Sequence, residues 1–182
     1  MTNRDEIDRK RAIDDLLAKQ EITEVIYLYC RCMDRCDVEM AKDIFHPDAT
    51  VDYGEQMYQG TGYGFVDMAL GGHALHVSHS HQHGNVLIRV DGNRAYSETY
   101  GDVTLRRRDE SGALIDSRNL GRCLDIWEKR EDGKWRIAER AFVLDFDEAG
   151  RASGSVFETT GRRDRSDPSY RLFAEGKLLP LE

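Results

Sequence analysis

Four of the six histidines of this 182-residue chain fall between His76 and His83. If that stretch is a β-strand, its two-residue period places His79, His81 and His83 on one face of a sheet. The ordinary pKa of imidazole lies near neutral pH, so three imidazoles on one face indicate either proton transfer or a metal site. His76 falls on the opposite face, and we predict a structural role for it.

These two chemistries make different demands on geometry. Side chains that alternate along one strand project nearly parallel, and they rarely converge on one ion without a ligand from another strand. Proton transfer needs only one imidazole whose tautomer is fixed by a hydrogen-bonded partner. We therefore favour proton transfer and keep zinc or iron binding as the alternative. The sequence contains no nucleotide-binding glycine loop, and we expect no cofactor.

The charge balance and the cysteines limit the possible partners and the compartment. A formal net charge of -8 and a pI near 5.3 disfavour nucleic acid or an anionic membrane surface as a partner. The four cysteines show neither zinc-finger spacing nor a disulfide framework. No apolar run approaches the ~18 residues needed to span a bilayer. We expect a soluble, cytoplasmic protein.

Helices are predicted in the first part of the chain. Apolar residues recur with helical spacing and predict a long helix from Asp14 to about Arg35, packed against a short helical turn over 38–45. His46 precedes Pro47, and because proline disfavours helix in the residue before it, we expect His46 to cap this turn.

Strands follow the helices. A short strand over 50–53 and a brief helix over 65–70 lead into four runs with strand character, over 75–90, 94–107, 118–129 and 135–146. Gly92 and Gly133 mark hairpin turns, since glycine supplies the positive φ that such turns require. Helices first and long antiparallel strands afterwards predict an α+β fold, with the helices on one face of a curved sheet.

Motifs spread along the chain carry a family resemblance. They are the runs 29–37, 45–49, 81–85 and 133–137. Their order and spacing resemble the SnoaL-like branch of the NTF2-like superfamily over roughly residues 10–146. The resemblance implies a cone-shaped barrel with an apolar pocket between a curved antiparallel sheet and the N-terminal helices. It also implies a SnoaL-like domain over 1–150. The stretch 151–182 is more polar and closes on the apolar run 178–181, and we expect it to be an irregular tail that packs on the body or on a neighbouring subunit.

The resemblance also implies a catalytic pair. In the dehydratase and dehydrochlorinase members, an aspartate near the end of the first helix pairs with a histidine four residues before a strand asparagine, and these positions are Asp34 and His81 here. A carboxylate bonded to one imidazole nitrogen fixes the tautomer and raises the basicity of the other nitrogen. Asp34 lies about 135° from the apolar stripe of its helix, which by itself is typical of a solvated residue. Asp37 is expected to be a cap or turn residue.

Further site residues are predicted around this pair. Tyr29 and Tyr53 are candidates for the acid side, because a phenol can donate to a developing oxyanion or a departing hydroxyl. Each could equally be a core tyrosine. His79 and His83 could orient a substrate or bond to a backbone carbonyl. The predicted contributors to a substrate pocket are Tyr100, Trp127 and Phe142.

The predicted function is a cofactor-independent lyase that acts on a small hydrophobic or aromatic substrate and eliminates water or releases formaldehyde. An isomerase or a cyclase would use the same residues, and a non-catalytic ligand-binding domain is the alternative from another class. Chloride loss fits less well, because Asp145 stands where dehydrochlorinases place a pocket arginine late in the last strand. The resemblance further implies a homo-oligomer, with a trimer favoured over a dimer.

Overall fold

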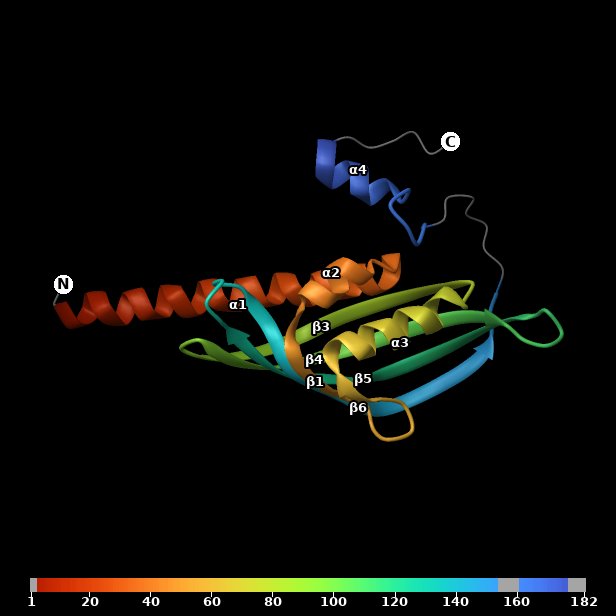
Figure 1. Ribbon diagram of the computed structural model, residues 1–182, viewed down its shortest axis with the longest axis horizontal. Coiled ribbons are helices and arrows are strands. Elements are labelled where there is room, and N and C mark those ends of the chain that lie inside the picture. The colour runs from red at the N-terminus through yellow and green to blue at the C-terminus, as the bar shows by residue number, and fades with distance from the viewer. Residues whose placement is uncertain (1–2, 154–160, 177–182) are drawn as a thin grey trace.

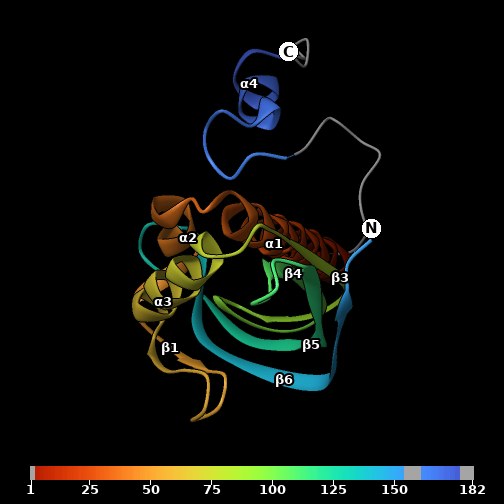
Figure 2. The ribbon, with the colours of Figure 1, turned by 90° about the vertical axis from the view of Figure 1, so that its right-hand side faces the viewer.

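The computed structural model describes residues 3–153 and 161–176. Its six strands form one sheet in the order β2-β1-β6-β5-β4-β3, and its four helices are α1, α2, α3 and α4. Helices α1, α2 and α3 cover the concave face of a curved sheet that does not close into a full barrel (Figures 1 and 2). The predicted α+β fold is confirmed.

Helix α1 spans Asn3–Arg35 and is longer than predicted. The early residues lack an apolar stripe, but they are mostly charged helix formers, which sustain a solvated helix. This part projects beyond the sheet, as Figure 1 shows. Further along, Ile22, Ile26 and Met33 are fully buried against the sheet. The helix stops at Cys36, whose backbone takes a left-handed φ of 51°.

Helix α2 spans Val38–Asp43, and the side chain of Asp37 caps it by accepting a hydrogen bond from the Met40 backbone N–H. The capping role predicted for Asp37 is confirmed. The role predicted for His46 is wrong, because β1 already begins at Phe45 and runs to Asp52. Pro47 is tolerated within this strand because the pairing of β1 with β6 is irregular between Phe45 and Thr50.

Strand β2 spans Gln59–Thr61 and leads directly into α3 over Gly62–Ala74, which is longer than the predicted 65–70. The Thr61 hydroxyl caps α3 by accepting from the Gly64 backbone N–H. Because α3 is apolar on the side that packs over β1, its buried residues include Phe65, Val66 and Leu70.

Long strands form the rest of the sheet: β3 spans Ser78–Asp91, β4 Arg94–Arg108, β5 Leu114–Lys129 and β6 Trp135–Arg151. They pair antiparallel in sequence order. The predicted hairpin glycines have positive φ, 60° at Gly92 and 74° at Gly133. One pairing was not predicted from the sequence, because β1 lies parallel to β6.

The segment 161–176 contains α4, Pro168–Glu175, which the sequence analysis treated as irregular tail. It lies against the end of α1: Arg31 donates to the Ser169 hydroxyl at 2.8 Å, and its guanidinium lies 4.5 Å from the ring centroid of Tyr170. The Tyr170 hydroxyl donates to Asp37 at 3.1 Å. The apolar run 178–181 lies outside the described residues. Within the described part of the chain, no helix has a stretch long and apolar enough to cross a membrane.

Candidate active site

Asp34 and His81 are in direct contact. Oδ1 of Asp34 accepts a hydrogen bond of 2.8 Å from Nδ1 of His81 and another of 2.9 Å from the backbone N–H of His81. The side chains are 17% and 5% exposed, respectively. Because Nδ1 donates to the carboxylate, the neutral ring leaves Nε2 unprotonated and able to act as a base.

The position of Asp34 follows from the place of α1 over the sheet. The apolar stripe of the helix faces the middle of the sheet, and β3 is the edge strand, so it lies beside the flank of the helix. A residue well away from the apolar stripe therefore meets the edge strand instead of solvent. Asp34 does lie away from the apolar stripe of α1, as the angle of about 135° predicted. It is nevertheless half-buried because β3, at the edge of the sheet, lies beside that flank of the helix.

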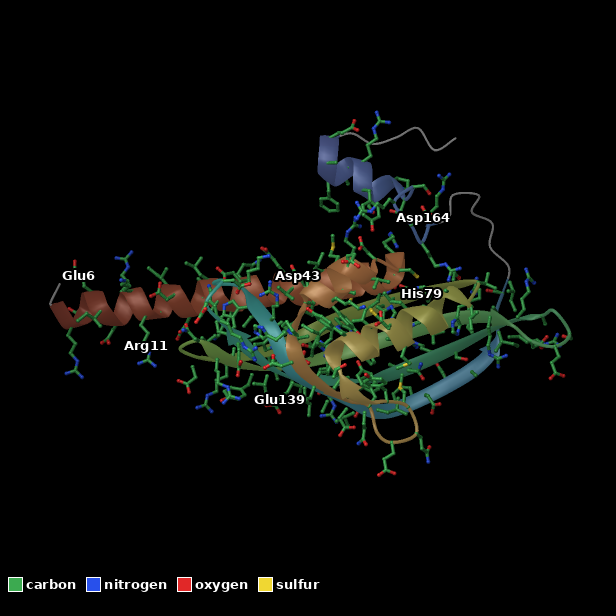
Figure 3. All side chains as sticks on the ribbon, viewed as in Figure 1. Glu6, Arg11, Asp43, His79, Glu139 and Asp164 are labelled. Atoms are coloured by element: carbon green, nitrogen blue, oxygen red, sulfur yellow. The ribbon has the colours of Figure 1, made fainter. Side chains whose placement is uncertain are left out.

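His79 holds the same helix end. Its Nε2 donates at 2.9 Å to the backbone carbonyl of Met33 in the last turn of α1, which also accepts from the Cys36 backbone N–H at 3.3 Å. Figure 3 places His79 on the helix-covered side of the sheet, opposite Glu139 on the other side. Of the two roles predicted for His79, the structure shows the bond to a backbone carbonyl for one of its two ring nitrogens.

Tyr29, Tyr53, His83 and Phe142 form an aromatic cluster beside the pair. The ring of Tyr29 stacks on His83 with centroids 5.6 Å apart and lies edge-on to His81 at 6.5 Å. The ring of Tyr53 stacks on Phe142 at 4.9 Å and on Phe65 at 4.6 Å. Burial raises the pKa of both phenols and lowers that of His83 to about 3, so all three are neutral near pH 7.

Arg140 is a buried cation that the sequence analysis missed. Its Nε and Nη2 donate to the two carboxylate oxygens of Asp125 at 2.6 and 2.8 Å, and its guanidinium lies 4.4 Å from the ring centroid of Tyr29. Strand alternation hides it, because a β-bulge at Ala138 shifts the inward face of β6 from Trp135 and Ile137 to Arg140 and Phe142. Asp145, which stands where the related dehydrochlorinases place a pocket arginine, pairs with Arg122.

His73 was also missed. It lies in the last turn of α3 and is 9% exposed, with its ring centroid 4.5 Å from that of His79 and 5.0 Å from that of His81. Burial, with the neighbouring imidazoles, lowers the pKa of His73 to about 3. The alternation of histidines along β3 indicates only the imidazoles of that strand, and no strand pattern indicates that a helix end contributes another one.

Two residues predicted for the substrate pocket lie elsewhere. Tyr100 is on the other face of β4 from Thr99 and Gly101, is 46% exposed, and borders a groove of about 440 Å³ that includes Leu120. Trp127 is fully buried, and its indole N–H donates to the Ser97 hydroxyl at 2.8 Å, so it belongs to the core.

The remaining histidines make local bonds. A ring nitrogen of His76 bonds to the Gly72 carbonyl, and one of His46 bonds to the Glu128 carbonyl. Among the residues that the structure describes, no group of three or more His, Cys, Asp or Glu side chains is arranged to hold a metal ion.

Comparisons with known proteins agree with this architecture. The family model described as the SnoaL-like domain matches residues 14–141. A scytalone dehydratase-like protein from Novosphingobium aromaticivorans is 19% identical, with 80% of this chain and 97% of that chain covered and a TM-score of 0.64. A hexachlorocyclohexane dehydrochlorinase is 14% identical, with 80% and 96% covered and a TM-score of 0.64.

An NTF2-like superfamily protein from Salmonella enterica is 25% identical, with 78% of this chain and 96% of that chain covered and a TM-score of 0.58. A comparison with curated proteins finds no match. The family model spans well over half of the chain, and the solved structures share its fold. The chain therefore belongs to the SnoaL-like domain family, within the NTF2-like superfamily.

Proposed function

We propose that this chain is a cofactor-independent lyase in which His81 removes a proton from a small hydrophobic or aromatic substrate. The observation that carries the proposal is the 2.8 Å bond from His81 Nδ1 to Asp34 Oδ1, made by two side chains largely withdrawn from solvent. A carboxylate in that position holds the ring in one orientation and stabilises the imidazolium that forms when Nε2 takes a proton.

The tyrosines supply the acid side. Burial keeps Tyr29 and Tyr53 protonated at neutral pH, so either phenol can donate to an oxygen that gains charge. Tyr29 is the nearer of the two to the base, because its ring contacts both His81 and His83. His83 and Phe142 supply aromatic surface beside these hydroxyls, which suits an aromatic ligand.

Loss of water would proceed as follows. His81 takes a proton from the carbon next to the one that bears the hydroxyl, and the electron pair of that C–H bond becomes the new double bond. The C–O bond breaks with its electrons on oxygen, and Tyr29 donates the proton that converts the leaving group to water. Tyr29 regains a proton from the imidazolium of His81 directly or through solvent.

Release of formaldehyde uses the same groups. His81 takes the hydroxyl proton of a hydroxymethyl substituent, the O–H electrons form the carbonyl of formaldehyde, and the C–C bond breaks. Its electrons form a carbon–carbon double bond as a neighbouring hydroxyl leaves as water, protonated by Tyr29. The dehydratase and dehydrochlorinase among the similar structures support an elimination of this kind. A homo-oligomer and a cytoplasmic location stay predictions.

The test is turnover of two substrate sets by the full chain. Aromatic secondary alcohols report water loss through the ultraviolet absorbance of a conjugated alkene, and diaryl propanediols report released formaldehyde. We expect turnover by the natural chain and a loss of about 10²–10⁴ in kcat/KM for His81→Ala. A product with the composition of its substrate would indicate an isomerase or cyclase. Tight binding without turnover would favour the non-catalytic domain.

A further inference from the structure

We propose that His73 and His79 form a hydroxyl-binding subsite beside His81, so that the substrate carries a hydroxyl group close to the atom that loses its proton. The inference rests on the proposed function and assigns part of its specificity to residues outside the Asp34–His81 pair. The ring of His73 comes from α3 and the rings of His79 and His81 from β3, so two separate elements build this corner of the site.

The first observation is the spacing of the rings. The centroids of His73 and His79 are 4.5 Å apart with planes tilted by 32°, and His81 lies 5.0 Å from His73 and 5.9 Å from His79. None of these pairs is hydrogen-bonded to another within the described residues. A group bound between His73 and His79 would therefore lie next to the base.

The second observation concerns unpartnered nitrogens. Nδ1 of His73 and Nδ1 of His79 are both buried, and neither has a hydrogen-bond partner in the ranges 3–153 and 161–176. A buried polar atom without a hydrogen-bond partner destabilises the folded chain. The two rings contact each other, so the two unpartnered nitrogens lie in the same corner of the site. A single small ligand group could form a hydrogen bond with each of them.

The donor and acceptor roles select the ligand group. Nε2 of His79 bonds to a carbonyl oxygen and must carry the proton, so its Nδ1 can only accept. We assign the proton of neutral His73 to its Nδ1, which then donates. A hydroxyl can donate to His79 and accept from His73 at once. A carboxylate has no donor for His79 and an ammonium has no acceptor for His73, so neither satisfies the pair.

The experiment compares two matched ligands that differ in donor capacity. Binding of 2-naphthol and of 2-methoxynaphthalene to the full chain is measured by calorimetry, since only 2-naphthol can donate a hydrogen bond to His79. We expect the natural chain to prefer 2-naphthol by about tenfold, which corresponds to one hydrogen bond of ordinary strength. His79→Phe should abolish the preference, whereas His73→Phe should weaken the binding of both ligands, because both carry an oxygen that can accept from His73. His76→Phe, a substitution near the same helix end in a ring that bonds to Gly72, should keep the preference.

A second measurement does not depend on the variant's stability. In the natural chain labelled with ¹⁵N-histidine, addition of 2-naphthol should shift the resonance of His79 Nδ1, and 2-methoxynaphthalene should leave it unshifted. Equal affinity of the natural chain for both ligands, or a preference that survives in His79→Phe, would overturn the subsite.

The subsite and the proposed reaction can fail independently. His81→Ala should lose proton abstraction while it retains the preference for 2-naphthol. A natural chain that prefers 2-naphthol but abstracts no proton would contradict the reaction and keep the subsite. A natural chain that abstracts a proton but shows no preference for 2-naphthol would contradict the subsite and keep the reaction.

Discussion

The guanidinium of Arg140 lies 4.4 Å from the ring centroid of Tyr29 and is held there by a two-point ion pair with Asp125. The arginine and aspartate side chains are 1% and 0% exposed. The ion pair thus holds the guanidinium in place against the ring of Tyr29, the residue that we propose as the acid. Because two ions have been taken out of water, the pair is costly to break from one side.

Asp125→Ala should therefore lower the free energy of unfolding by about 3–5 kcal/mol, since it leaves an uncompensated guanidinium in the core. The double variant Asp125→Leu with Arg140→Met should lose much less, because no charge stays buried. Urea denaturation of both variants measures the difference. If the double variant is as unstable as the single variant, the loss of stability does not come from an uncompensated charge, and the Asp125–Arg140 ion pair itself stabilises the fold.

Asp34→Asn should reduce kcat/KM by about 10²–10⁴, because the amide no longer fixes the tautomer of His81 or stabilises its imidazolium. Asp37→Asn is the matched control, since its side chain caps α2 and also accepts from Tyr170. Steady-state kinetics on any turned-over alcohol gives the comparison. Equal losses in the two variants would assign the effect to the helix end rather than to the pair.

The stability of the chain should fall as the pH drops below about 6.5, in part because of His73. Its pKa is lowered by burial from 6.5 to about 3, so between these values the unfolded chain binds a proton that the folded chain does not. From pH 7 to pH 5, this one residue should remove about 2 kcal/mol from the free energy of unfolding.

The measurement is urea denaturation at both pH values for the natural chain, His73→Phe and Thr23→Ala, a partly exposed, non-titrating control on α1. The drop in His73→Phe should be smaller by about that amount, and Thr23→Ala should behave like the natural chain. An unchanged drop in His73→Phe would contradict the burial argument.

Gly121→Ala should destabilise the chain by about 1–3 kcal/mol and disturb the aromatic cluster. A Cβ at this position would lie 2.5 Å from Cζ of Phe142 and 2.5 Å from the Val143 carbonyl oxygen, so either the ring or the strand must move. Gly71→Ala is the control, because a Cβ there meets nothing within 4 Å and α3 gains about 0.5–1 kcal/mol from the loss of a helix glycine. Thermal unfolding of the two variants should shift in opposite directions.

Much of the fold was predictable because it depends on local patterns. Helical spacing located α1, and strand periodicity with Gly92 and Gly133 located the four long strands. The start of β1 was predicted too late, at residue 50, because Pro47 was taken as the end of the preceding helical turn. An irregular pairing with β6 accommodates this proline within the strand. The parallel pairing of β1 with β6 depends on how distant segments pack, and no local pattern indicates it.

The site was predictable where it follows one strand or a family motif. The contact of Asp34 with His81 came from the motif, against an angular count that placed Asp34 towards solvent. His73 and Arg140 were not found, because one comes from a helix end and the other from a strand far along the chain. Tyr100 was expected to face the pocket, but it lies on the opposite face of β4 from its neighbours Thr99 and Gly101. A shift of one residue along a strand reverses the face on which a side chain lies.

The measurement that tests the central claim most directly is exchange of carbon-bound protons for deuterium, because it requires no leaving group. The natural chain is incubated in deuterium oxide with 2-tetralone, an aromatic ketone with acidic C–H bonds, and the loss of the proton signal is followed by NMR. Exchange faster than with His81→Ala, and slowed by Asp34→Asn, is the result we predict. Equal exchange rates with the natural chain and with His81→Ala would contradict the role of His81 as the base.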